Sequence, residues 1–101
     1  MKRIAMTDGS GQWFDIDSAK DFDEGTTWDG SNHISMATRS QTEHESLYRT
    51  ASGKWVLNEW SQWQGSIQTW KVVDDDTAAQ WLITNGQDSD IVKSQIADLE
   101  L

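Results

Sequence analysis

The chain has 101 residues with no cysteine and no proline, and 17 acidic against 8 basic residues give it a formal charge of −9. A chain of this length is expected to form one domain over residues 1–101, and without cysteine it has neither disulfides nor thiolate metal ligands. Its few basic residues form no cluster, so we expect no direct binding of nucleic acid.

The opening residues, MKRIAM, contain an apolar stretch too short for the core of a signal peptide. No later stretch is long and apolar enough to span a bilayer. We therefore expect a cytoplasmic protein with no membrane partner, and nothing in the sequence calls for a cofactor.

The segment RIAMT (residues 3–7) is typical of a strand, the run DGSG after it favours a turn, and QWFDI (12–16) is aromatic and β-branched. This pattern predicts a β-hairpin. Residues 17–45 show no sustained period, so we predict one helical turn at their start, capped by Asp17 or Ser18, and otherwise a long loop. A polar loop of this length is uncommon in a compact domain and often functional.

The stretch ESLYRTASGKWVLNEW (residues 45–60) has two strand-like runs on either side of the dipeptide SG, which predicts a second hairpin. With Ser52 and Gly53 as a two-residue loop, Thr50 lies opposite Trp55 and Tyr48 lies opposite Leu57. The run IQTWKVV (67–73) predicts a further strand, and strands joined in this order usually form an antiparallel meander.

The acidic run that precedes TAAQWLITNG predicts an α-helix with Asp75 or Asp76 as its N-cap and Gly86 as its terminator. Its apolar stripe consists of Ala78, Trp81 and Leu82. A second helix is predicted over DSDIVKSQIADLEL, residues 88–101, where apolar residues recur at helical spacing. We therefore predict an α+β fold, in which a small antiparallel β-meander of about four to five strands packs against two C-terminal helices in two layers.

Tryptophan is unusually frequent, with seven residues in the chain and four of them between residues 54 and 73. Alternation along a strand places Trp55 and Trp60 on opposite faces of the sheet, and one helical layer covers one face only. At least one of these rings is therefore expected near solvent. For Trp63, in the polar loop SQWQGS, exposure and burial are equally open.

Exposed tryptophan on an acidic surface favours a protein-interaction module that binds a basic partner, because tryptophan is enriched at interface centres and carboxylates attract basic grooves. We expect an inhibitor of a nucleic-acid-handling protein, in the manner of a DNA-mimic anti-defence (anti-CRISPR-like) protein or an antitoxin. A homodimer through the same surface is an alternative. The candidate contact residues are Asp21, Asp23, Glu24, Asp29, Trp60, Trp63, Asp74, Asp75 and Asp76.

A carbohydrate-binding module is a second reading of the exposed rings, since sugars stack on flat aromatic faces edged by amide groups. Its candidate residues are Asn58, Trp60, Gln62, Trp63 and Gln64.

A small metal-dependent enzyme is a third reading, with His33 and His44 as candidate ligands. In a strand, however, Glu43 and Glu45 share one face and His44 lies on the other, so the three do not converge. No nucleophile elbow, phosphate-binding glycine loop or zinc-protease motif occurs. We therefore expect a binding protein and not an enzyme, with neither a metal nor catalytic residues.

Overall fold

The structure is a computed structural model that describes residues 1–87, 93, 94, 97, 100 and 101. Its elements follow the chain in a simple order. They are β1 (Arg3–Ala5), β2 (Trp13–Asp15), the 3₁₀-helix η1 (Ile16–Ser18), β3 (Lys20–Asp23), β4 (Thr26–Trp28), β5 (His33–Ser35), β6 (Glu43–Arg49), β7 (Trp55–Ser61), β8 (Thr69–Val73) and α1 (Asp75–Thr84).

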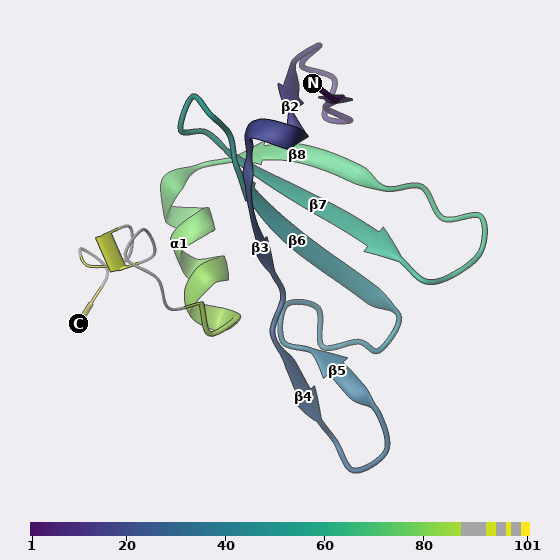
Figure 1. Cartoon of the computed structure of the whole chain (residues 1–101). Coiled ribbons are helices and arrows are strands. Elements are labelled where there is room, and N and C mark those ends of the chain that lie inside the picture. Colours follow the sequence, from purple (N-terminus) through teal and green to yellow (C-terminus); the bar gives the residue numbers. More distant parts are fainter. Residues whose placement is uncertain (88–92, 95–96, 98–99) are drawn as a thin grey trace.

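The strands form a central four-stranded sheet in the order β3-β6-β7-β8 and two separate hairpins, β1-β2 and β4-β5. All strand pairs are antiparallel. Figure 1 shows α1 beside the central sheet, the β1–β2 hairpin at one end of it and the β4–β5 hairpin projecting from the other. Among the described residues, no helix is long and apolar enough to cross a membrane.

The predicted fold class is wrong. The described part of the chain holds eight strands in three sheets and a single α-helix, where a meander of four to five strands and two helices was expected. The second predicted helix, over residues 88–101, lies largely outside the described residues, which in this stretch are 93, 94, 97, 100 and 101.

Much of the difference comes from residues 17–45, which form η1, β3, β4 and β5 instead of a helical turn and a long loop. The three strands have only three or four residues each, too few to show an alternating pattern in the sequence. Moreover, β3 is fixed by pairing with β6, where Phe22 lies opposite Leu47, far along the chain. Local sequence carries little information about such a long-range partner.

The hairpin of β6 and β7 forms as predicted, but its register differs by one residue. Arg49, and not Thr50, lies opposite Trp55, and Tyr48 lies opposite Val56. The backbone N–H of Thr50 donates to the carbonyl of Lys54 over 2.8 Å, so the loop has three residues instead of two. Its last residue, Gly53, has a φ of 85°, which is the left-handed conformation that closes a three-residue hairpin.

The core lies between the central sheet and α1. From the sheet, Phe22, Leu47, Trp55 and Leu57 point toward the helix, and the helix contributes the predicted stripe of Ala78, Trp81 and Leu82. The helix begins one residue earlier than expected, because Asp74 is its N-cap and accepts a hydrogen bond from the Thr77 N–H over 2.7 Å. Gly86 follows the last turn with a φ of 67°, as expected of a terminator.

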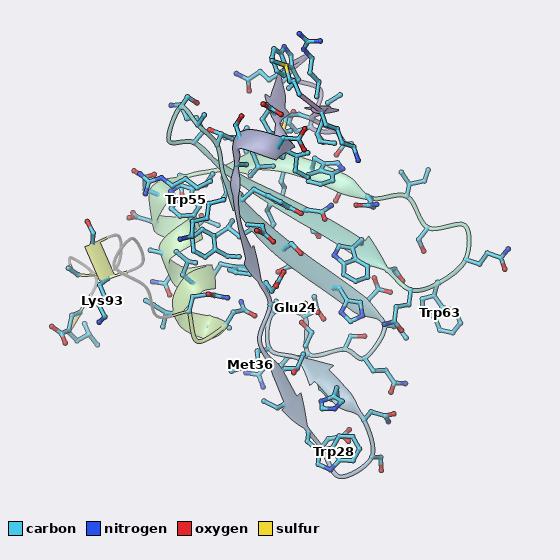
Figure 2. All side chains as sticks on the ribbon, in the orientation of Figure 1. Glu24, Trp28, Met36, Trp55, Trp63 and Lys93 are labelled. Carbon is cyan, nitrogen blue, oxygen red and sulfur yellow. The ribbon has the colours of Figure 1, made fainter. Side chains whose placement is uncertain are left out.

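The opposite face of the central sheet is only partly covered. There the ring of Phe14, from β2, packs against Tyr48 and Trp70 with both centroid distances at 5.8 Å. Trp55 and Trp60 point to opposite faces, as predicted, and only Trp55 is fully buried. Figure 2 shows Trp28 on the projecting β4–β5 hairpin and Trp63 on the β7–β8 connection, well apart from Trp55 beside the helix.

Candidate functional site

A hollow of about 300 Å³ lies beside the end of β7, where the chain leaves the central sheet for the connection to β8. We call it the acidic hollow, because three glutamates line it. Its lining residues are Thr38, Glu43, His44, Glu45, Glu59, Trp60, Ser61, Trp63, Ser66, Ile67 and Thr69.

The glutamates meet because of the register of β6 and β7. Glu45 lies directly opposite Glu59, and Glu43 lies opposite Ser61, so all three carboxylates share one face of the sheet. Like charges directly opposite each other destabilise a sheet. The arrangement therefore has a cost for the free protein, which a bound cation would relieve.

Each glutamate side chain contacts one partner within the described residues, and only one of the three partners is a cation. The Lys71 ammonium lies 3.0 Å from Glu59. The indole N–H of Trp81 donates to Glu45 over 3.0 Å, and the Ser61 hydroxyl donates to Glu43 over 3.1 Å. Within the described residues, only one of the three carboxylates, that of Glu59, is therefore in an ion pair.

Burial and the neighbouring glutamate both disfavour the ionised form of Glu45. Burial raises the pKa of this carboxyl above its ordinary value, the hydrogen bond from Trp81 opposes the rise, and the nearby charge of Glu59 adds to it. The protonated form of Glu45 is therefore favoured in the folded protein more than in the unfolded chain. A second positive charge in the acidic hollow would favour the ionised form instead.

The rim of the acidic hollow is apolar and open to solvent. Trp63 is 66% exposed and Ile67 is 85% exposed, and both belong to the β7–β8 connection. The connection, residues 62–68, contains a turn in which the Ser66 N–H donates to the Trp63 carbonyl over 3.2 Å and Gly65 has a φ of 86°. It thus places large apolar groups beside carboxylates, the combination that a basic and partly apolar partner would contact.

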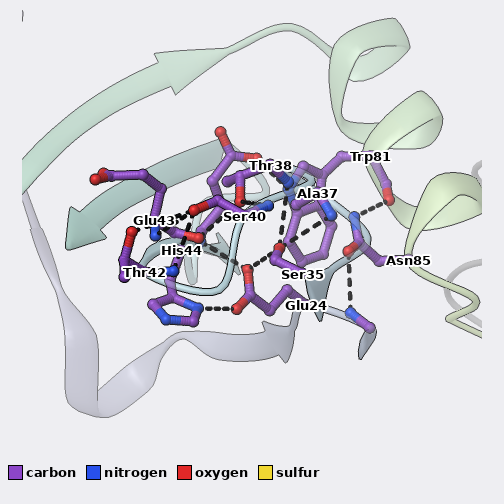
Figure 3. A network of polar contacts seen from close by, with 12 residues as sticks. Glu24, Ser35, Ala37, Thr38, Ser40, Thr42, Glu43, His44, Trp81 and Asn85 are labelled. Carbon is purple, nitrogen blue, oxygen red and sulfur yellow. Dashed lines mark hydrogen bonds and ion pairs between the residues drawn. The ribbon is translucent and has the colours of Figure 1, made fainter. Parts of the chain in front are cut away.

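The wall of the acidic hollow is held from beneath by a buried carboxylate. Trp60 stacks on the imidazole of His44 with ring centroids 4.5 Å apart, and the Nδ1 atom of His44 is hydrogen-bonded to Glu24. Glu24 is only 11% exposed and His44 only 12%. Glu24 also accepts hydrogen bonds from the Ser35 hydroxyl over 2.5 Å and from the Glu45 N–H over 3.0 Å. Figure 3 shows Glu24 between His44 and Ser35.

Glu24 therefore connects three elements. Ser35 belongs to β5, and its hydroxyl accepts hydrogen bonds from the backbone N–H groups of Ala37 and Thr38, over 3.1 Å and 3.2 Å. The next residue along the chain, Gly25, donates its N–H to the side chain of Asn85 at the end of α1 over 3.0 Å. The base of the β4–β5 hairpin is thus fixed to both β6 and the helix.

The structure separates the predicted contact residues. Trp60 and Trp63 line the acidic hollow, whereas none of the predicted carboxylates does. Asp21 and Asp23 are exposed on the edge strand β3. Glu24 is not a surface carboxylate at all, as its network shows.

The remaining predicted carboxylates have local structural roles or lie at the helix start. Asp29 is in the β4–β5 turn, where it accepts hydrogen bonds from the Asn32 and Ser31 N–H groups that lower its pKa. Asp74 caps α1, and Asp75 and Asp76 form its first turn.

The sequence reasoning missed Glu43, Glu45 and Glu59 as a group. The alternation of side chains along a strand had already placed Glu43 and Glu45 on one face. The third member, Glu59, could be assigned to this group only from the register of β6 and β7, which places it opposite Glu45. A one-residue error in the hairpin loop was enough to hide this relationship.

The carbohydrate and metal hypotheses gain no support from the geometry. Asn58 is buried, and its side-chain amide donates to Gln68 and to the Thr69 carbonyl instead of edging an exposed ring. His33 packs against Trp28, whereas His44 is bonded to Glu24. Within the described residues, no group of three or more His, Asp or Glu is placed to hold a metal ion.

Compared with protein-family models, curated proteins and solved structures, the chain matches none of them.

Proposed function

We propose that the protein is an interaction module whose acidic hollow receives a lysine or arginine side chain from the basic surface of another protein. The observation that carries the proposal is the position of Glu45 directly opposite Glu59, with Glu43 on the same face. A guanidinium or ammonium group entering the acidic hollow would remove the repulsion between these carboxylates and gain charge-assisted hydrogen bonds.

The apolar rim supports the same reading. Trp63 and Ile67 stand exposed beside the glutamates, and the hydrocarbon stem of a lysine or arginine would pack against them. An indole face also attracts a nearby cation. Trp63 is thus the aromatic anchor of the proposed interface, whereas Trp60, stacked on His44, forms part of its wall.

The remaining charge would speed the encounter. Several further carboxylates have no ion-pair partner among the described residues, and they include those of Asp21, Asp23, Asp29, Asp74, Asp75 and Asp76. Such a field accelerates association with a basic surface and is screened by salt.

A basic groove that holds nucleic acid is the partner surface that fits this charge best. In that case the protein would act as an inhibitor or antitoxin in the cytoplasm, occupying the groove in place of DNA or RNA. A second prediction follows, that the partner loses affinity for nucleic acid when the protein is bound to it.

The test is affinity capture from cells with three immobilised proteins. One is the wild type, one carries Glu43→Gln and Glu59→Gln in the acidic hollow, and one carries Asp21→Asn and Asp23→Asn on β3. The two variants have the same net charge. A basic protein that is retained by the wild type and the β3 variant, and lost from the hollow variant, supports the proposal.

The captured protein is then tested for salt dependence and for competition with nucleic acid. Binding should weaken steeply between about 50 and 500 mM salt, over which the Debye length falls from roughly 14 to 4 Å. Equal retention by both variants would show that total charge, and not the acidic hollow, determines binding.

A further inference from the structure

A second and larger cavity lies at the other end of β7, between the β1–β2 hairpin and the central sheet. It has a volume of about 650 Å³ and is lined by residues of the hairpin, of the β6–β7 turn and of β7 and β8. We call it the N-terminal groove. Pockets for small ligands usually measure about 300–1,000 Å³. The N-terminal groove is therefore large enough for a small organic molecule, and it shares no lining residue with the acidic hollow.

The N-terminal groove has an apolar floor and an apolar wall. Phe14 and Val56 are buried in its floor, whereas Trp13 is 53% exposed and Val72 is 41% exposed beside them. Large side chains this accessible still have apolar surface to bury. A flat apolar body lying between Trp13 and Val72 would cover that surface.

Two basic residues, Lys54 and Arg3, lie at or beside the N-terminal groove. Lys54 lines it, and within the described residues no carboxylate lies within ion-pair distance of its ammonium group. The guanidinium of Arg3 lies over the Trp13 ring, 4.9 Å from its centroid. Arg3 likewise has no carboxylate partner among these residues.

The oxygens of the nearby carboxylates are held by hydrogen bonds from neutral donors. Asp15 also lines the N-terminal groove, but it accepts hydrogen bonds from the Ser18 hydroxyl and from the N–H groups of Lys2 and Asp17, which lower its pKa. The carboxylate of Asp8, next to Val72, is held in the same way, chiefly by Ser10. Both carboxylates stay ionised, but their oxygens are directed toward these donors, whereas Lys54 has no carboxylate partner within the described residues.

We propose that the N-terminal groove binds a small aromatic anion, with its ring system between Trp13 and Val72 and its anionic group beside Lys54. The site is separate from the acidic hollow and does not depend on the proposed protein partner. Opposite charges at the two ends of β7 give the protein two sites of opposite preference.

Two fluorescent probes with the same ring system test the proposal. The anion 8-anilinonaphthalene-1-sulfonate should bind the folded wild type saturably with one-to-one stoichiometry, and more tightly than neutral N-phenyl-1-naphthylamine. Lys54→Gln should weaken binding of the anion by about two- to fivefold, the effect of one partly exposed charge, and leave the neutral probe unchanged. The charge-matched control is Arg39→Gln, outside the N-terminal groove.

A second pair of variants tests the contribution of the apolar wall. Trp13→Ala should weaken both probes by about tenfold, the value expected from losing part of one aromatic face, and Trp28→Ala should have no effect. Circular dichroism confirms that each variant is folded. In the wild type, a ¹⁵N spectrum should show the shifts of the anion complex around Gln12, Ser52 and Lys54, a measurement that needs no variant.

Equal affinities for Trp13→Ala and Trp28→Ala, or for Lys54→Gln and Arg39→Gln, would overturn the proposal. So would amide shifts around Trp63, or the lack of saturable binding.

Discussion

The imidazole of His44 lies between Glu24 and the indole of Trp60. Its Nδ1 atom is hydrogen-bonded to Glu24, and its ring stacks on Trp60 with centroids 4.5 Å apart and an interplanar angle of 28°. A largely buried carboxylate thereby fixes the ring of Trp60, which lines the acidic hollow although it lies on the face of the sheet opposite the three glutamates. The hydrogen bonds of Glu24 to Ser35 and to the Glu45 N–H extend this control to the strand that carries the glutamates.

Replacing Glu24 by glutamine should destabilise the protein. Glutamine has a single acceptor oxygen for the three groups that donate to Glu24, which are His44, Ser35 and the Glu45 N–H. At least one buried donor then loses its partner, which costs about 1–3 kcal/mol of unfolding free energy. Urea denaturation measures the change. Asp23→Asn, at the exposed neighbouring residue, is the control and should stay within about 0.5 kcal/mol of the wild type.

Replacing Glu45 by glutamine should stabilise the protein at neutral pH. Burial raises the pKa of Glu45, so the folded state binds a proton more tightly than the unfolded chain. Stability from this group is therefore full below the unfolded pKa and falls as the pH rises through the folded pKa. Glutamine keeps an acceptor for Trp81 and removes the charge that faces Glu59.

The expected gain from Glu45→Gln at pH 7 is a few tenths of a kcal/mol, the usual size for a partly exposed charge. It should shrink as the pH falls through the raised folded pKa of Glu45 and be lost below about 4.5, the ordinary value, because the wild-type carboxyl is then protonated in both the folded and the unfolded state. Thermal unfolding at several pH values measures both effects. A gain that is constant with pH would contradict the assigned role of this charge.

The single tyrosine of the chain reports on the acidic edge of the central sheet. Burial raises the pKa of Tyr48, and the charges of Asp21 and Asp23 on β3 add to this rise. The double variant Asp21→Asn, Asp23→Asn should therefore lower the pKa of Tyr48 toward its ordinary value. Ultraviolet titration of the phenolate measures it. Asp29→Asn, in the β4–β5 turn, should leave the titration curve unchanged.

Gly25 is required by the close packing at the base of the β4–β5 hairpin. A Cβ atom at this position would lie 2.6 Å from the Met36 sulfur and 2.9 Å from the Asn85 carbonyl oxygen. Gly25→Ala should therefore cost about 1–3 kcal/mol of stability, as overpacking usually does. The cost should be smaller in a Met36→Ala background, because one of the two close contacts is then gone. The same cost in both backgrounds would show that Met36 does not cause it.

Part of this fold could be predicted because its signals are local. Residues 74–86 carry a cap, an apolar stripe and a terminator, and the structure has the helix there with the stripe buried. The alternation along β7 likewise gave the correct opposite faces for Trp55 and Trp60. Both patterns depend only on the geometry of one element.

The rest depended on partners distant in the sequence. Strand β3 is fixed by its pairing with β6, and the acidic hollow exists because Glu59 meets Glu45 across two strands. The three-residue loop ending at Gly53 fixes that meeting, and a two-residue loop would have placed different side chains opposite each other. Glu24 shows the same limit, because nothing in its local sequence distinguishes a buried carboxylate from an exposed one.

The most direct test of the acidic hollow is a ¹⁵N spectrum of the protein titrated with a hexa-arginine peptide, with a hexa-glutamine peptide as control. We predict shifts concentrated at Glu43, Glu45, Glu59 and Trp63 that appear with arginine only. They should be lost in the Glu43→Gln, Glu59→Gln variant and kept in the Asp21→Asn, Asp23→Asn variant. Shifts spread evenly over the exposed carboxylates, or equal in the two variants, would contradict the account.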